Sequence, residues 1–118
     1  MQMKIVQVVN AIISNSGKIT NVLKKESEYF FMYNNKYKWS IKKAEEDNIY
    51  FLYFYPTNDK TLEELADIND WAGFSNYMAY RTDEIKTKEA LESFSDLYQT
   101  VANKVFGVDE IFDEIINS

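Results

Sequence analysis

The sequence predicts an α+β fold: an antiparallel meander sheet of about five strands, an N-terminal helix, a long C-terminal helix and a short terminal helix. Residues 29–55 crowd aromatic and β-branched residues between two polar breaks, which is typical of three strands joined by tight turns. Apolar residues recur at helical spacing in residues 3–14 and again between Thr87 and Gly107. The length of 118 residues suits one core, so we expect a single α+β domain over residues 1–118.

The expected N-terminal helix covers residues 3–14, and Gly17 follows as its terminator. Residues 18–25 predict a first strand, and the polar segment that follows turns the chain into Tyr29. The apolar positions of the helix are Ile5, Val8, Val9, Ile12 and Ile13.

The pair Asn34-Asn35 tolerates positive φ and therefore predicts a two-residue hairpin turn. With Tyr33 opposite Lys36, the register would place Met32 opposite Tyr37, Phe30 opposite Trp39 and Glu28 opposite Ile41. An even-length loop at the second break, residues 45–48, completes an inner face, whereas an odd-length loop would swap the last strand. The predicted inner face consists of Phe30, Met32, Trp39, Ile41, Leu52 and Phe54.

The other side of this predicted sheet would carry an aromatic platform with lysines at its edge. Contiguous exposed aromatic residues usually mark a contact surface, although a helix or a second protomer could equally cover the platform. We expect either a partner-binding face or a homodimer interface. Its residues are Tyr29, Phe31, Tyr33, Phe51, Tyr53 and Tyr55, with Lys36 and Lys38.

The second half of the chain leaves the sheet at Pro56 and returns to it once. Thr61 begins a capping-box pattern that predicts a short helix to about Ala66. Residues 75–82 predict an additional strand at the sheet edge. The longest helix begins at Thr87 or Lys88 and should cover the inner face.

The last predicted helix, residues 108–116, separates apolar residues on one side from acids on the other. Acids at a spacing of four repel by about 0.2–0.5 kcal/mol per pair, so either a solvated face or a functional surface must explain them. The candidate acidic partner-binding residues are Asp96, Asp109, Glu110, Asp113 and Glu114.

The sequence contains neither cysteine nor histidine. Thiolate metal sites, cysteine nucleophiles and the commonest general base are therefore missing. Residues 67–73 resemble a calcium loop in composition, but Trp71 and Ala72 stand where a ligand and a glycine should be. We expect no enzyme activity, no catalytic residues, no cofactor and no metal site.

Charge is distributed unevenly along the chain, whose net charge is −6. Residues 18–43 hold seven lysines against two glutamates, or +5, whereas residues 45–118 hold seventeen acids against five bases, or −12. Such polarity can orient a charged partner. The acidic total opposes direct nucleic-acid binding.

These observations favour a non-catalytic inhibitor or immunity-type protein that blocks a functional surface of another protein, one with a basic surface, through acidic nucleic-acid mimicry or an aromatic interface. Small acidic proteins of this kind include phage anti-defence inhibitors, toxin-neutralising immunity proteins and secretion chaperones. The alternatives are a chaperone-like or homodimeric module and a binder of single strands or small ligands. The N-terminus predicts neither a membrane span nor a signal peptide, so we expect a cytoplasmic protein, and the lysine-rich composition suggests a low-GC bacterium or its phage.

Overall fold

A computed structural model describes residues 2–45, 48–56, 59–68, 77–105 and 108–118, with side chains from residue 4 onward and, in the last segment, from residue 111. It confirms the α+β fold with a five-stranded antiparallel sheet in the order β1-β2-β3-β4-β5. The elements are α1 (Gln2–Ser14), the 3₁₀ helix η1 (Ser16–Lys18), β1 (Ile19–Lys25), β2 (Glu28–Tyr33), β3 (Tyr37–Lys43), β4 (Tyr50–Tyr55), α2 (Leu62–Ala66), β5 (Met78–Arg81), α3 (Thr82–Ile85), α4 (Lys88–Val105) and α5 (Val108–Ile116).

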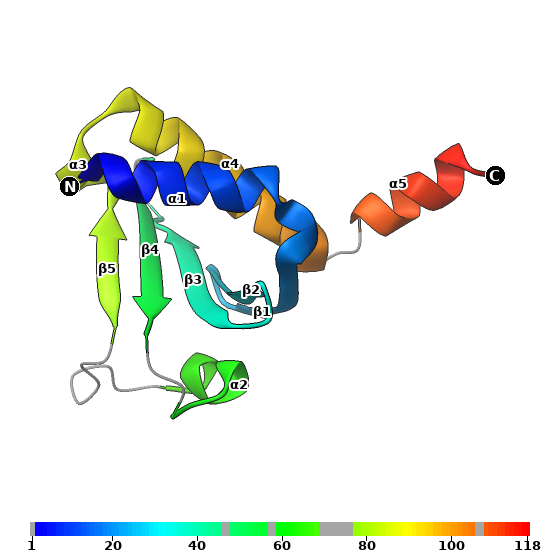
Figure 1. The fold of residues 1–118 in the computed structure, drawn as a ribbon, viewed down its shortest axis with the longest axis horizontal. Helices are drawn as coiled ribbons and strands as arrows, with labels where there is room; N and C mark the ends of the chain where they lie inside the picture. Colours follow the sequence, from blue (N-terminus) through cyan, green and yellow to red (C-terminus); the bar gives the residue numbers. More distant parts are fainter. Residues whose placement is uncertain (1, 46–47, 57–58, 69–76, 106–107) are drawn as a thin grey trace.

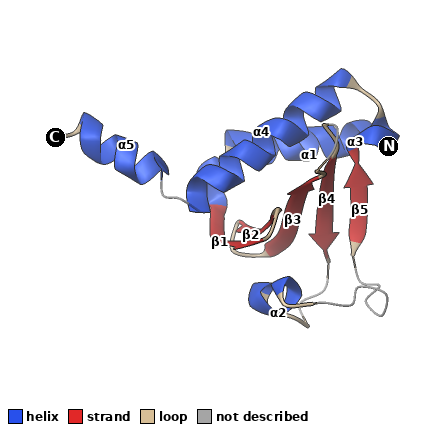
Figure 2. Ribbon diagram, turned by 180° about the vertical axis from the view of Figure 1, so that it is seen from behind, coloured by secondary structure: helices blue, strands red, loops and turns tan. Residues whose placement is uncertain are grey.

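Two helices from opposite ends of the chain cover one side of the sheet, which we call the helix face. Helices α1 and α4 lie side by side across it, while α2 lies at the lower end of the sheet, away from them (Figure 1). The view from behind shows the same arrangement, with α5 extending away from the body (Figure 2). The molecule therefore has a layer of two helices on one side of the sheet, while α2 packs on the other side against β1 and β2.

The helix layer forms because α1 and α4 each bury one apolar stripe. Val9 and Ile12 of α1 are at most 2% exposed, and Phe94 and Leu97 of α4 are fully buried. The two helices are also joined by a hydrogen bond of 2.7 Å from Ser93 Oγ to Asn10 Oδ1. The prediction that the long helix covers the sheet is confirmed by these contacts.

The predicted register of the first hairpin is wrong by one residue. Asn34 and Asn35 do adopt positive φ, at 59° and 54°, and the Lys36 N–H bonds to the Tyr33 carbonyl at 3.2 Å. However, Tyr33 pairs with Tyr37, so Lys36 belongs to the loop and the hairpin connection has three residues instead of two. A one-residue slip moves every side chain of β2 to the opposite side of the sheet.

The slip exchanges the two predicted faces within β2 and leaves β3 and β4 unchanged. Phe31 pairs with Trp39 on the helix face, and Phe30 pairs with Ser40 on the other side, which we call the distal face. The six-residue connection between Lys43 and Tyr50 has even length, as the predicted arrangement of β4 requires. The distal face carries Glu28, Phe30, Met32, Lys38, Ser40, Lys42, Phe51, Tyr53, Tyr55, Tyr77 and Arg81.

Both edges of the sheet are irregular or short. In β1 the pairing shifts between Thr20 and Leu23, and Asn21 there has a φ of 55°, which marks a bulge. The opposite edge is β5, where the sequence predicted an edge strand, although only four residues pair. Residues 69–76, which include the start of that predicted strand and most of the rejected calcium loop, lie outside the described residues.

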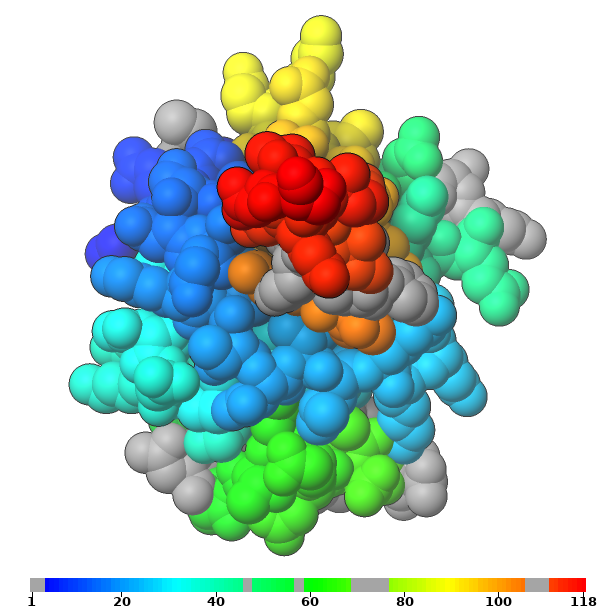
Figure 3. All heavy atoms as spheres, turned by 90° about the vertical axis from the view of Figure 1, so that its right-hand side faces the viewer, coloured from blue at the N-terminus to red at the C-terminus, as the bar shows by residue number. Residues whose placement is uncertain are grey.

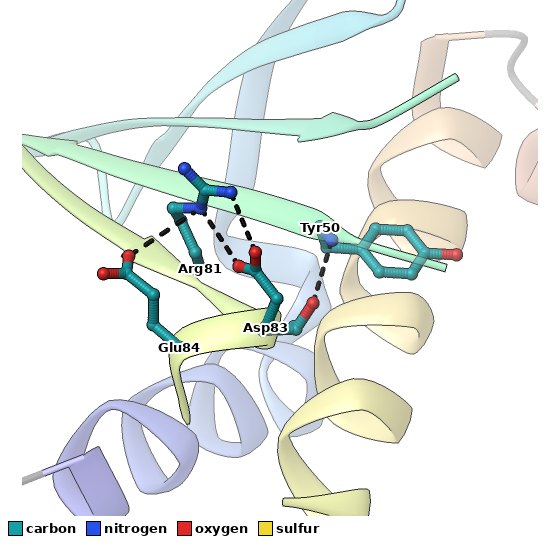
Figure 4. A network of polar contacts seen from close by, with 5 residues as sticks. Tyr50, Arg81, Asp83 and Glu84 are labelled. Atoms are coloured by element: carbon teal, nitrogen blue, oxygen red, sulfur yellow. Dashed lines mark hydrogen bonds and ion pairs between the residues drawn. The ribbon is translucent and has the colours of Figure 1, made fainter. Parts of the chain in front are cut away.

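The junction of β5 and α3 is fixed by polar contacts to β4 and within itself (Figure 4). Arg81 donates two hydrogen bonds to Asp83, at 3.0 and 2.8 Å, and lies 3.7 Å from Glu84. The Tyr50 N–H donates to the buried Thr82 hydroxyl at 3.0 Å. These bonds hold the short helix α3 in place from Thr82, the last residue of the predicted strand, and the sequence predicted no helix there.

The two remaining predicted helices are present. Helix α2 has the predicted capping box: Thr61 Oγ1 accepts from the Glu64 N–H at 3.1 Å, and Glu64 accepts from the Thr61 N–H at 2.8 Å. Helix α5 spans the predicted residues 108–116. No helix in the described segments is long and apolar enough to cross a bilayer.

Candidate functional site

A fully buried polar side chain, Ser40, lies at the centre of the distal face. Its hydroxyl donates to Glu28 Oε2 at 2.7 Å and lies 2.8 Å from the Tyr55 hydroxyl. When Ser40 donates to Glu28, Tyr55 must donate to Ser40, which gives a relay from Tyr55 through Ser40 to the carboxylate. Strands β2, β3 and β4 thus each contribute one member of the relay.

A cavity of about 210 Å³ opens above this relay. Glu28 and Tyr55 form part of its wall, so the carboxylate at the end of the relay faces the cavity. Its lining residues are Glu28, Lys42, Tyr53, Tyr55 and Tyr77. The side chain of Lys42 is otherwise exposed to solvent.

Aromatic rings continue from this cavity toward the β5 edge. Tyr53 and Tyr77 meet at an angle of 68° with centroids 5.8 Å apart. Phe51 stacks parallel to Tyr53 at 6.4 Å, and the guanidinium of Arg81 lies 4.9 Å from the centroid of Phe51. Phe51 and Tyr53 are only partly buried, so this row is open to a ligand from solution.

Burial alters the ionisation of the groups around the cavity. Desolvation raises the pKa of Glu28 above its usual 4.5, although the Ser40 hydrogen bond and the charges of Lys42 and Lys25 oppose the rise. Desolvation also raises the pKa values of Tyr53 and Tyr55, and the nearby Glu28 carboxylate adds to both. The tyrosines therefore remain neutral donors and ring surfaces at physiological pH.

The structure divides the predicted aromatic platform between the two faces. Tyr29 and Phe31 are buried in the core under the helices, and Tyr33 packs partly buried against the same core. Lys36 lies in the hairpin turn, with its Nζ 5.3 Å from the centroid of the Tyr37 ring. Four members, Phe51, Tyr53, Tyr55 and Lys38, share the distal face, and their binding role stays a prediction.

The cavity also contains residues that the sequence did not single out as site residues. These are Glu28, Lys42 and Tyr77, with Ser40 beneath the cavity. Glu28 was missed because the predicted register put it on the inner face, opposite Ile41. A signal was present, since that register placed a carboxylate among apolar residues under a helix, which is costly without a partner.

The predicted acidic residues do not lie on one element. Asp96 is exposed in the middle of α4, whereas Asp113 and Glu114 are exposed on α5. The side chains of Asp109 and Glu110 lie outside the described residues. Among the described residues, no three carboxylates gather closely enough to hold a metal ion.

The apolar side of α5 is uncovered. Ile111, Phe112, Ile115 and Ile116 are 51%, 56%, 64% and 78% exposed. The helix extends beyond the end of α4, and the view onto that end of the molecule shows its red atoms standing in front of the body (Figure 3). The sequence drew attention to the acids of this helix, but its exposed apolar residues are the less expected feature.

Comparison with known proteins gives no family assignment: no family model, no curated protein and no solved structure significantly matches this chain. Function must therefore be argued from the two surfaces just described.

Proposed function

We propose that this protein is a non-catalytic inhibitor or immunity-type protein, which docks α5 into an apolar groove with a basic rim on a partner protein and thereby occupies a functional surface of that partner. The observation that carries the proposal is the exposed apolar side of α5, because contiguous apolar surface on a small protein usually marks an interaction site. An amphipathic helix laid into a groove is a common mode of protein recognition.

The apolar residues of α5 can supply the affinity. Ile and Phe side chains contribute about 1.5–3 kcal/mol each on full burial. Because these side chains are more than half exposed, burying the rest of each in a groove should contribute about 1 kcal/mol or more to the binding free energy. Ile111 and Phe112 both neighbour Ile115 on the helix surface, because they precede it by four and three residues.

The acids of α5 define the chemistry of the partner. Asp113 and Glu114 are exposed, and the sequence adds Asp109 and Glu110 within the same nine residues. Two copies of this helix would bring like charges together, whereas lysines and arginines around a groove would neutralise them and speed association. A groove that normally binds nucleic acid or another acidic chain has this chemistry. Toxin-neutralising and phage anti-defence inhibitors act on grooves of this kind.

Full-length variants of α5 test the proposal. The protein is first used to capture partners from lysate of a low-GC bacterium, and the captured partner is then purified for titration calorimetry. We expect Ile111→Ser/Phe112→Ser/Ile115→Ser to weaken binding about a hundredfold, since about 3 kcal/mol is lost. Asp113→Lys/Glu114→Lys should weaken it about tenfold and remove most of its salt dependence.

The matched control is Glu89→Lys/Glu92→Lys, which makes the same charge change on the exposed side of α4 and should leave affinity within about twofold. Binding that survives the triple serine substitution would show that α5 is not the docking element. A wild-type dimer in light scattering that the serine variant converts to monomers would instead assign the helix to self-association.

A further inference from the structure

We propose that the distal cavity is a binding site for an alkylammonium group, either a free amine or the side chain of a lysine, held by the Glu28 carboxylate and the rings of Tyr53, Tyr55 and Tyr77. This site lies on the distal face of the sheet, whereas the proposed docking surface lies on α5. The inference therefore goes beyond the proposed function and does not depend on it.

The charge in the cavity comes from a carboxylate that has no close cationic partner. No lysine or arginine nitrogen among the described residues lies within 4 Å of Glu28. Lys42 lies opposite it in the strand register and also lines the cavity, but its side chain is exposed and can extend into solvent when a cation enters. A partly desolvated carboxylate without an ion pair favours any cation that can reach it.

The rings select an organic cation over a simple metal ion. Ring faces attract ammonium groups through their quadrupole, and cages of aromatic rings recognise alkylated ammonium ions in this way. Tyr53 and Tyr77 stand at 68° to each other and so form two walls, while Tyr55 supplies a third. A cavity of about 210 Å³ has room for a small alkylammonium group.

The site is held in place before a ligand arrives. The Tyr55 ring stacks on Phe30 with centroids 6.3 Å apart, and its hydroxyl is fixed by the hydrogen bond to Ser40. Ser40 in turn orients Glu28 Oε2. Because these side chains are already ordered, less entropy is lost on binding.

Titration of the full-length protein with tetramethylammonium chloride tests the proposal by ¹H–¹⁵N NMR. Sodium chloride at the same ionic strength and sodium butyrate serve as ligand controls. We expect saturable shifts, in the millimolar range, of amides around residues 28, 40, 53 and 77, and only weak shifts with the controls. Butylammonium and N-acetyl-lysine amide distinguish a site for free amines from one for lysine side chains.

Variants separate the charge from the rings. Glu28→Gln should weaken tetramethylammonium binding by about tenfold or more, equivalent to about 1.4 kcal/mol, and Tyr53→Leu should weaken it comparably. The matched control Glu63→Gln removes an exposed acid on α2, and Ile111→Ser/Phe112→Ser/Ile115→Ser alters only α5. Both should bind like the wild type, whatever the outcome of the partner experiments.

The affinity for the cation should also decrease as the pH is lowered, because the protonated Glu28 attracts no cation. The charged and titratable groups that face it are Lys25 and Glu26 from the connection between β1 and β2, Lys42 from β3, and Tyr53, Tyr55 and Tyr77. Of the two carboxylates, Glu28 lines the cavity and Glu26 does not. Absence of saturable shifts, equal binding of butyrate, or wild-type affinity in Glu28→Gln would each overturn the proposal.

Discussion

Glu28 shows how one residue can oppose the stability of the fold that holds it. Desolvation raises its pKa, so in the pH range just above 4.5 the folded state binds more protons than the unfolded state. The free energy of unfolding therefore falls as the pH rises from about 4.5 through the pKa of the folded state. The charged carboxylate thus lowers the stability of the fold at neutral pH, and a binding role gives a reason for its presence.

Replacing the carboxyl group should reveal that loss. We expect Glu28→Gln to be more stable than the wild type at neutral pH by up to about 1 kcal/mol, since an amide oxygen still accepts from Ser40 and carries no charge to desolvate. Urea denaturation from pH 4 to pH 8 measures the difference, which should vanish at the acid end. Glu63→Gln is the control and should show no such trend, and a Glu28→Gln variant less stable at neutral pH would contradict the argument.

Lys36 is the residue at which the sequence could not decide the fold. A two-residue turn and the observed three-residue connection both begin with Asn34 and Asn35 at positive φ, so local propensity fits either. The choice is made by packing, because Phe31 and Trp39 must share the face that the helices bury. This tertiary preference is why the binding face was predicted with half of its aromatic residues misplaced.

At the scale of the elements, sequence patterns within single segments were sufficient to predict most helices and strands. The helical spacing of α1 and α4, the capping box of α2 and the five strands all follow from local periodicity and turn chemistry. Helix α3 was missed because its start depends on the Tyr50 N–H donating to Thr82, a contact across 32 residues. The cavity was missed for the same kind of reason, since three strands build it.

The capping box of α2 should matter beyond its own five residues. Leu62 and Leu65 of this helix are buried against the cluster that includes Phe30 and Tyr55, so loosening α2 uncovers the wall of the cavity. We expect Thr61→Ala to lower the free energy of unfolding by about 1 kcal/mol, whereas Thr61→Ser should change it little. Thermal unfolding by circular dichroism compares the two variants, and equal melting temperatures for both would contradict a structural role for the cap.

At the scale of the whole molecule, α5 makes the shape longer than the core requires. The radius of gyration is 14.5 Å, against about 13.5 Å for a compact domain of this length, and the extents are 50 × 33 × 27 Å. The charge is also divided along the chain, because residues 18–43, which contain β1 to β3, carry +5 and residues 45–118 carry −12. Both features suit a protein that presents one end to a partner.

Removing α5 should change the shape and leave the core intact. We expect a chain that ends at Val105 to unfold within about 0.5 kcal/mol of the full-length protein, because the described side chains of α5 are exposed. Its radius of gyration in small-angle X-ray scattering should fall toward the compact value. A large drop in stability on truncation would mean that α5 is part of the core.

The pairing of α1 with α4 also has a consequence for the newly made chain. Every strand pairs with its neighbour in sequence, so the sheet can assemble as it leaves the ribosome. Asn10 and Ser93, in contrast, are 83 residues apart. At a synthesis rate of about 5–20 residues per second, about 4 to 17 s pass between the synthesis of Val9 and Ile12 and that of the α4 residues that pack against them. The first helix to emerge from the ribosome therefore keeps part of its apolar side uncovered until most of the chain has been made.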